Sequence, residues 1–309
     1  MDVSGFRQVR LRPRRLLLLL RAVGLGLVLL AASAGGAAAD RPSTCSGTFA
    51  SPGVLAGTYT SNVTVEGACL VNGGPALVAG NLTVSPGAVL LAAFADNGSK
   101  LTVQGNLQVK RDATLILGCE PLSAYPCLDN SEISSQSSVS GNLSAQQPLG
   151  VVVHSSTING NVQETGGGGG FTCDNKGPTV DHHPVFGAAF GGLPVFSGYE
   201  DSTVHGNLSV IGLSSCWLGV ARTHVSGNVN LINNQLADPD AMEILTNQIS
   251  GNLLCQQNSQ VWDNAESTPG GALFPRDATP PNTVSGNRVG QCVLASPTTA
   301  GGPSGPGPF

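Results

Sequence analysis

The chain has 309 residues, a formal net charge of −5 and only 11% charged residues. Six of the 14 basic residues and one of the 19 acidic residues precede Asp40, so the remainder carries 8 basic and 18 acidic residues. Nucleic acids and anionic membrane surfaces are bound by clustered Lys and Arg, and this balance therefore excludes both as expected partners. It is compatible with cations and with neutral glycans.

The first 39 residues have the pattern of a secretory signal peptide. Five arginines precede Leu16–Leu20, and Ala37–Ala39 places small residues before Asp40. Arg21 interrupts the apolar stretch and leaves it short for a membrane span. We therefore expect residues 1–39 to be removed on export, with membrane contact only if this segment stays uncleaved. The expected location is extracellular or associated with the cell wall.

A short phrase recurs after this leader: an apolar residue, one spacer, then Gly-Asn, usually followed by Leu or Val. Apolar and polar residues alternate around it, as in Leu82-Thr83-Val84, and such alternation with β-branched residues is typical of strands. Successive asparagines are separated by 19 to 25 residues, or by 35, 36 and 46. The asparagines of the phrase are Asn81, Asn106, Asn142, Asn161, Asn207, Asn228, Asn252 and Asn287.

The shorter intervals match one coil of a repeat protein, and the longer ones indicate coils with loops directed outward. We therefore predict an all-β fold, a right-handed parallel β-helix (β-solenoid) with disulfide-pinned loops, over residues 40–299. The Gly-Asn coils occupy about residues 60–290, with a loop excursion at 166–200 and a disordered tail at 300–309. A β-sandwich is the alternative, because many short strands with turn signals also fit that class.

The two residues of the phrase suggest how the coils turn and stack. Glycine and asparagine enter left-handed backbone conformations readily, so we expect them to form a sharp bend between two strands. Asparagine can also pass amide hydrogen bonds from one coil to the next, as in the ladders of parallel sheets. Asn62–Gly67 resembles a degenerate first coil.

Other segments are predicted to be accessories of the coils. Asp238–Leu245 contains N-cap residues, an early proline and a capping-box spacing from Asp240 to Glu243, which predicts a short flanking helix. The glycine run Gly166–Gly170 is predicted to be a flexible connector. An open solenoid needs caps at its two ends, and the segments that contain Cys45 and Cys292 are the candidates.

All eight cysteines follow the leader, which indicates up to four disulfides in an oxidising compartment. Eight cysteines allow about 105 pairings, so the sequence alone does not fix the connectivity. Residues far apart in a solenoid sequence are far apart in space, and we therefore favour local pairing. The predicted pairs are Cys45–Cys69, Cys119–Cys127, Cys173–Cys216 and Cys255–Cys292.

The recurring phrase resembles the short repeats of bactofilins and related right-handed β-helical proteins, whose coils also use Gly turns and Val, Ile and Leu strands. The resemblance covers about residues 60–290. Bactofilins are cytosolic, lack disulfides and polymerise end to end, whereas this chain carries a leader and cysteines; self-association is therefore left open. The segment Asn282–Cys292 is also similar to the C-terminal ends of secreted bacterial proteins without an assigned activity.

Polysaccharide-cleaving enzymes often use a β-helix with carboxylates on the outer face of stacked strands, in some cases with calcium and a basic residue. This sequence offers Glu200-Asp201, Asp238 with Asp240, and Asp263 with Glu266. Each lies in a polar segment, and we expect solvated surface acids rather than a catalytic pair. No catalytic residue is assigned.

A divalent-metal site, for zinc or a similar ion, is a second hypothesis. His205 and His224 occupy outward-facing spacer positions one coil apart, and Asp181, His182 and His183 lie together in the loop excursion. Adjacent histidines in a loop also commonly face solvent without binding an ion.

Aromatic residues are concentrated near the same excursion. Phe186, Phe190, Tyr199 and Trp217 are candidates for stacking on sugar rings or docking a protein partner. The alternative is a satellite core that pins the long loop to the coils.

Two functions are therefore compared. The favoured one is a secreted, non-catalytic β-helical protein with a structural, adhesive or binding role at the cell envelope or outside the cell, with polysaccharide as partner. The alternative is a carbohydrate-active β-helix, binding or cleaving polysaccharide, with its site near residues 166–224.

Overall fold

The structure is a computed structural model that describes residues 43–94, 98–121, 127, 132–173, 194–238, 242–259, 261–263 and 282–293. The chain divides into two compact units, residues 1–39 and 40–309, and every described residue belongs to the second. The predicted signal peptide and the predicted tail at 300–309 lie outside the described residues. The described part contains no helix with the length and hydrophobicity of a membrane span.

The described residues are nearly all β, with one short 3-10 helix, η1 (Gln291–Val293). Strand pairings join them into one 25-stranded sheet and a separate pair, β17 (Ser214–Ser215) with β21 (Gln235–Leu236). Each pairing described is parallel, as in a β-solenoid, whereas a β-sandwich is built from antiparallel strands. The all-β prediction with parallel strands is therefore confirmed.

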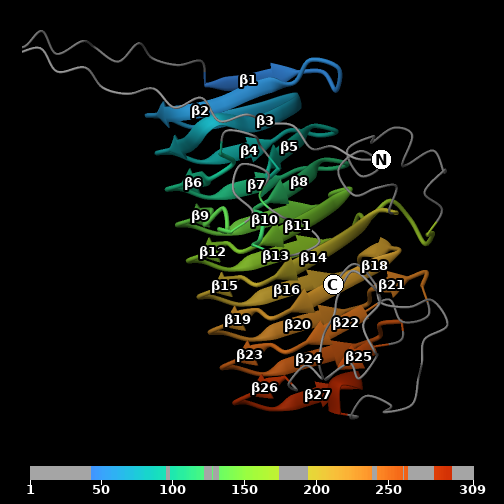
Figure 1. Cartoon of the computed structure of the whole chain (residues 1–309). Coiled ribbons are helices and arrows are strands. Elements are labelled where there is room, and N and C mark those ends of the chain that lie inside the picture. The colour runs from blue at the N-terminus through green and yellow to red at the C-terminus, as the bar shows by residue number, and fades with distance from the viewer. Residues whose placement is uncertain are drawn as a thin grey trace, which may run out of the picture. The chain divides into compact units, whose positions relative to one another are not determined.

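The strands stack in three columns, because most coils contribute one strand to each (Figure 1). The first column follows the Gly-Asn phrase and contains β1 (Thr44–Gly47), β4 (Leu82–Val84), β7 (Leu107–Val109), β10 (Leu143–Gln146), β13 (Val162–Thr165), β16 (Leu208–Ile211), β20 (Val229–Ile232), β24 (Leu253–Gln256) and β27 (Arg288–Gly290). The second contains β5 (Val89–Ala92), β8 (Thr114–Leu117), β11 (Gly150–His154), β14 (Phe196–Glu200), β18 (Trp217–Ala221), β22 (Met242–Leu245) and β25 (Val261–Asp263). The third contains β6 (Leu101–Val103), β9 (Ser138–Val139), β12 (Thr157–Ile158), β15 (Thr203–Val204), β19 (His224–Val225), β23 (Gln248–Ile249) and β26 (Thr283–Val284).

The first coils are joined by one long strand, β3 (Val63–Val78), which takes part in all three columns. It pairs with β1, β4, β5 and β6, and along two segments with β2 (Gly53–Tyr59). The predicted first coil at Asn62–Gly67 is therefore present, because Val63 pairs with Leu82 of the following coil.

The core lies between the columns and is formed by the inward half of each alternating strand. In the first column the register stacks Leu143, Val162, Leu208 and Val229, all at most 1% exposed. Burying each such side chain contributes about 1.5–3 kcal/mol. Stability therefore comes from many equivalent layers, each resting on its neighbours.

The predicted asparagine ladder is present from Asn62 to Asn287. Each asparagine Oδ1 accepts a hydrogen bond from the backbone N–H of the asparagine in the next coil, at 2.8–2.9 Å throughout. For example, Asn142 accepts from Asn161 and donates to Asn106. This relay satisfies a backbone donor at the corner of each coil, where the strand ladder is interrupted.

The role expected for the glycines of the phrase was wrong. They are not among the residues with positive φ. A Cβ at Gly105 would instead lie 2.6 Å from Asn81 Oδ1 and 2.7 Å from the carbonyl oxygen of Gly80. Glycine is required because successive coils approach closely there.

Residues with a left-handed backbone instead occupy two other corners of the coils. One of these corners stacks Gln147, Gly166, Gly212, Asn233 and Gln257, and the other stacks Ser155, Asp201, Arg222 and Thr246.

Two local predictions are corrected by this stacking. The segment predicted as a helix at 238–245 contains strand β22, whose residues pair with β18 and β25; residues 239–241 lie outside the described residues. Met242 and Ile244 join the core, and this burial outweighs the capping-box signal. The run Gly166–Gly170 is not a free connector either, because Gly166, Gly168 and Gly170 donate backbone hydrogen bonds to neighbouring coils.

The structure contains four disulfides, between the same cysteines that local pairing predicts: Cys45–Cys69, Cys119–Cys127, Cys173–Cys216 and Cys255–Cys292. The first joins strands β1 and β3 at one end of the described coils, and the last joins strand β24 to the 3-10 helix η1 at the other. Four disulfides indicate an oxidising, extracellular environment.

Candidate functional site

The outward side of the third column is a surface of uncharged polar residues, which we call the polar wall. Its strands carry one outward residue each, and a second outward residue follows two positions later. The register places the first set in one row across successive coils: Thr102, Ser138, Thr157, Thr203, His224, Gln248 and Thr283. The second row is exposed and contains Gln104, Ser140, Asn159, His205, Ser226, Ser250 and Ser285.

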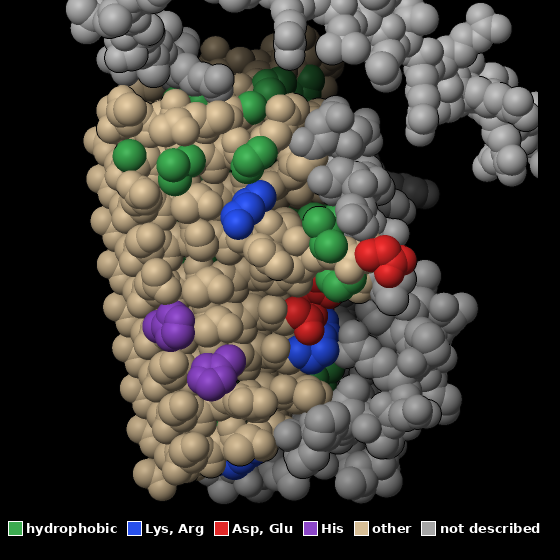
Figure 2. All heavy atoms as spheres, turned by 60° about the vertical axis from the view of Figure 1, so that its left-hand side comes forward, with side chains coloured by type: hydrophobic (Ala, Val, Ile, Leu, Met, Phe, Trp, Pro, Cys, Tyr) green, Lys and Arg blue, Asp and Glu red, His purple; other side chains and the backbone are tan. Residues whose placement is uncertain are grey.

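The local sequence explains why this surface is regular. Between the two rows each coil places an inward Val or Ile, such as Val139 or Ile158, which are at most 1% exposed and fix their strands to the core; Val284 of the last coil is half-buried. The backbone N–H of each second-row residue donates to the coil before it, as Asn159 does to Val139 at 2.9 Å. Strand geometry then spaces the side chains at about 4.8 Å between coils and about 6.7 Å between rows. Figure 2 shows this face as mostly uncharged polar side chains and backbone, with exposed histidine on it.

The two predicted histidine ligands lie on the polar wall. Thr203, and not His205, is the register partner of His224, so the two imidazoles are diagonal neighbours in adjacent coils. Rung spacing and strand rise separate their backbone positions by about 8 Å. Asp181, His182 and His183, predicted to complete this metal group, lie outside the described residues.

A second constellation lies at the outer edge of the second column and consists of Glu120, His154, Glu200, Asp201 and Arg222. We call it the buried charge cluster. His154 Nδ1 lies 3.0 Å from Glu120 Oε1 and 3.8 Å from Glu200 Oε1, and the three side chains are 0–7% exposed. Arg222 Nη2 pairs with Glu200 Oε2, and Arg222 Nε donates to both carboxylate oxygens of Asp201 at 2.8 Å.

Two opposing effects set the pKa values in this cluster: burial disfavours the charged form of each group, and nearby opposite charges favour it. Burial disfavours the imidazolium of His154, but the charge of Glu200 and the hydrogen bond to Glu120 outweigh it and raise the pKa of His154. Burial alone would raise the pKa of Glu120, yet the hydrogen bond and charge of His154 lower it. Burial raises the pKa of Asp201 in spite of Arg222. Both shifts favour the charged forms of Glu120 and His154, because each group stabilises the charge of the other.

Backbone register brings these residues together. His154 pairs directly with Glu200 across β11 and β14, and Asp201 and Arg222 follow in the left-handed corner with φ of 48° and 52°. Glu120 follows Cys119, whose disulfide to Cys127 anchors that segment. Four successive coils therefore supply one charge cluster.

The expectation that Glu200 and Asp201 are solvated surface acids was wrong for Glu200, which is 2% exposed. The sequence interpretation also missed Glu120 and His154. A signal for His154 was present, because His154 and Glu200 each precede the asparagine of their own phrase by the same seven positions. No comparable signal marks Glu120, because it precedes the phrase asparagine of its own coil, Asn142, by 22 positions and not by seven.

The aromatic candidates do not form a common binding surface among the described residues. Tyr199 is 1% exposed and its hydroxyl donates to Glu164 at 2.8 Å, so it is not available to stack on a sugar ring. Trp217 is half-buried and packs edge-to-face against Phe196, with ring centroids 6.2 Å apart. Phe186 and Phe190 lie outside the described residues.

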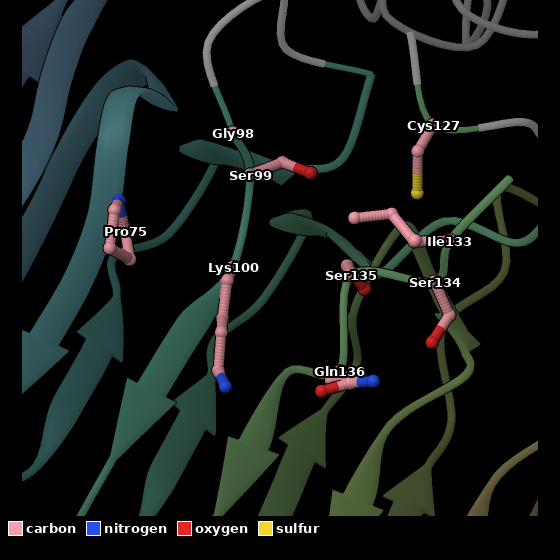
Figure 3. A pocket seen from close by; sticks show the side chains of 9 residues that line it. All are labelled: Pro75, Gly98, Ser99, Lys100, Cys127, Ile133, Ser134, Ser135 and Gln136. Carbon is pink, nitrogen blue, oxygen red and sulfur yellow. The ribbon is translucent and has the colours of Figure 1, made fainter. Parts of the chain in front are cut away.

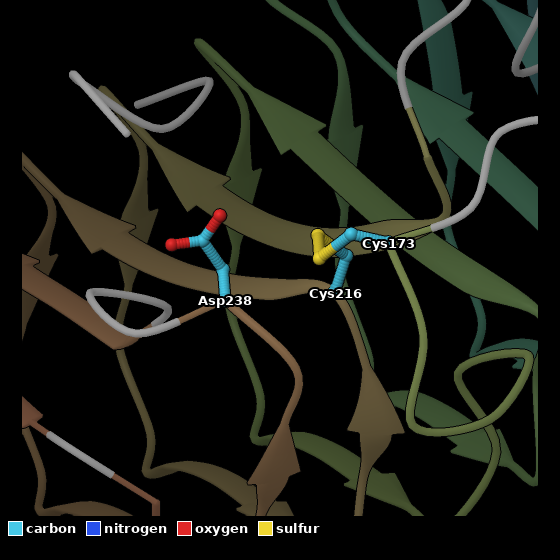
Figure 4. Close-up of side chains that lie close together, drawn as sticks. All are labelled: Cys173, Cys216 and Asp238. Carbon is cyan, nitrogen blue, oxygen red and sulfur yellow. A yellow bond between two sulfur atoms is a disulfide. The ribbon is translucent and has the colours of Figure 1, made fainter. Parts of the chain in front are cut away.

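Cys173, Cys216 and Asp238 also lie close together, as Figure 4 shows. The two sulfur atoms are joined in a disulfide and offer no thiolate, so this group does not form a metal site.

A small pocket of about 260 Å³ opens beside the start of β6 (Figure 3). Lys100 is the charged residue of its lining, and Ser99, Ile133 and Gln136 also face it. Among the described residues, its lining contains neither a carboxylate nor a histidine.

No protein-family model, curated protein or solved structure matches this chain.

Proposed function

We propose that this protein is a secreted, non-catalytic, right-handed β-helix that binds neutral polysaccharide of the cell wall or the extracellular space through the polar wall. The supporting observation is the regular, uncharged double row of hydroxyl, amide and imidazole side chains on the third column, whose second row is exposed and whose first row is half-buried or exposed.

The chemistry of this surface favours a glycan. Ser, Thr, Asn and Gln side chains both donate and accept hydrogen bonds, as sugar hydroxyls do. The absence of Lys, Arg, Asp and Glu from both rows disfavours charged polymers, which need opposite charges on the protein. Because the coils hold the rows in register, little side-chain or backbone conformational entropy is lost on binding an extended chain.

Export supports the same proposal. The arginine–leucine leader and the four disulfides fit a protein that leaves the reducing cytosol and remains in an oxidising environment. A protein of the cell envelope must stay folded outside the cell. Disulfides at both ends of the coil stack stabilise this one.

The test is co-sedimentation of the chain with insoluble neutral and charged polysaccharides, beside a protein-alone control. We expect the chain to pellet with neutral polysaccharide, with little change when salt is raised, because screening acts on charge pairs. Pelleting only with anionic or cationic polymers, and release by salt, would contradict the proposal. Pelleting alone would indicate self-association.

Cleavage of polysaccharide remains the alternative, and the buried charge cluster favours it in one respect, since it brings three carboxylates and an arginine together. However, Asp201 is the most exposed of its carboxylates, at 31%, and is already paired with Arg222. Release of new reducing ends during prolonged incubation with bound polysaccharide would establish cleavage and remove the non-catalytic proposal.

A further inference from the structure

We propose that the buried charge cluster is a binding site for one divalent transition-metal ion, with Glu120, His154 and Glu200 as ligands. Glu120 Oε1, His154 Nδ1 and Glu200 Oε1 would each supply one bond. This proposal does not depend on polysaccharide binding by the polar wall.

The spacing of the ligand atoms supports this proposal. The three side chains place one ligand atom each within 4.8 Å of the others, and the two printed separations from His154 Nδ1 are 3.0 and 3.8 Å. An ion bound at 2.0–2.2 Å to nitrogen and carboxylate oxygen keeps its ligands roughly 3–4 Å apart. An ion therefore fits among these atoms after only small side-chain movements.

A second observation concerns Glu200. Its Oε1 is buried and has no hydrogen-bond partner in the described part of the chain, and His154 Nδ1 lies 3.8 Å from it. A buried carboxylate oxygen without such a partner costs free energy. A metal ion bound to Glu120 and His154 would satisfy it.

Arg222 and Asp201 supply the outer hydrogen bonds that commonly hold metal ligands in place. Arg222 binds Glu200 through the other oxygen, Oε2, and is itself held by Asp201. This arrangement orients Glu200 and leaves its Oε1 directed at His154. Carboxylate ligands in metal sites are oriented by such outer hydrogen bonds.

The charges also balance. With a neutral imidazole, the cluster contains three carboxylates and one guanidinium, an excess of two negative charges that a divalent ion neutralises. The ion would take the place of the proton that His154 Nδ1 shares with Glu120. One nitrogen and two carboxylate oxygens suit Zn²⁺ or Mn²⁺, whereas Ca²⁺ requires six or more oxygen ligands.

The ion would join residues from three coils and fix the segment after Cys119 against β11 and β14. Its test is metal binding by the full chain, stripped with a chelator and then incubated separately with Zn²⁺, Mn²⁺ and Ca²⁺. After desalting, we expect about one Zn²⁺ or Mn²⁺ per chain by elemental analysis, a higher unfolding temperature, and no retained Ca²⁺.

The variant Glu120→Gln keeps the size of the side chain and should lower metal affinity roughly tenfold or more. The double variant His205→Ala/His224→Ala is the matched control, because it removes the exposed imidazoles and should retain the ion. A folded parent chain that retains no ion, or a Glu120→Gln variant with unchanged affinity, would overturn the proposal.

A measurement on the parent chain covers the case in which Glu120→Gln does not fold. Co²⁺ bound by the nitrogen and oxygen ligands of the site should have a visible absorption spectrum that differs from that of the aqueous ion. Added Zn²⁺ should displace the bound Co²⁺ and abolish this spectrum. A Co²⁺ spectrum like that of free aqueous ion would also overturn the proposal.

Discussion

At the scale of single residues, the position of Glu164 is unusual. It lies on the inward side of β13, between Ala145 and Val210 in the neighbouring coils, where the other coils place apolar residues. Ser197 Oγ and the Tyr199 hydroxyl donate to its two oxygens at 2.7 and 2.8 Å. Burial outweighs these hydrogen bonds and raises the pKa of Glu164 from 4.5 to about 7. The interior therefore holds an acid that is neutral below this pH.

This raised pKa predicts a pH-dependent stability. The folded state binds a proton that the unfolded state has released between pH 4.5 and about 7, so stability falls as pH rises through this window. The contribution is on the order of 3 kcal/mol. The variant Glu164→Gln keeps the shape and cannot ionise, so its free energy of unfolding should fall less between pH 5 and 8 than that of the parent. Thermal or denaturant unfolding at both pH values measures the free energy of unfolding of the parent and the variant. An equal loss of stability in the two proteins would contradict the raised pKa of Glu164.

At the scale of elements, much could be predicted from the sequence because the Gly-Asn phrase marks the same point in each coil. Its spacing predicts the parallel strands, the asparagine ladder and the local disulfides. The strand β22 was missed because helix-capping signals in Asp238–Leu245 are local, whereas its pairing with β18 depends on neighbours in space. The buried charge cluster was missed for the same reason, since its members come from four coils and only His154 and Glu200 share a position relative to the phrase.

The asparagine ladder supports a second prediction. Asn142 Oδ1 accepts from the backbone and the side chain of Asn161, at 2.8 and 3.2 Å. Asn142→Ala leaves the Asn161 backbone donor without that partner and should destabilise the fold by about 1–3 kcal/mol. Asn159→Ala, on the exposed row of the polar wall in the adjacent coil, is the control and should change stability by about 0.5 kcal/mol or less. Denaturant unfolding of both variants measures the difference, and equal effects would show that the ladder is not stabilising.

At the scale of the described coil stack, each coil rests on the next, so the two ends carry the strand edges that remain unpaired. The Cys255–Cys292 disulfide joins β24 to η1 at the C-terminal end of the described coils. Such a link keeps the last coils from separating from the stack.

Removing this link should therefore loosen one end first. Cys255→Ser/Cys292→Ser should lower stability by about 2–4 kcal/mol. Hydrogen exchange should become faster in β24 and β27, while β10 and β13 near the middle stay protected. Uniform acceleration along all strands would instead show that the coils unfold as a single unit.

The proposal that the polar wall binds polysaccharide is tested most directly by changing the charge of that surface. Ser226→Lys/Ser250→Lys adds two charges to the wall, and Gln256→Lys/Val289→Lys adds the same two to exposed positions of the first column. The measurement is the dissociation constant of parent and both variants for the neutral polysaccharide that sediments with the parent. We expect the wall variant to bind at least about tenfold more weakly, a loss of about 1.4 kcal/mol, and the first-column variant to bind like the parent. Equal affinity of the wall variant and the parent would contradict the proposed function.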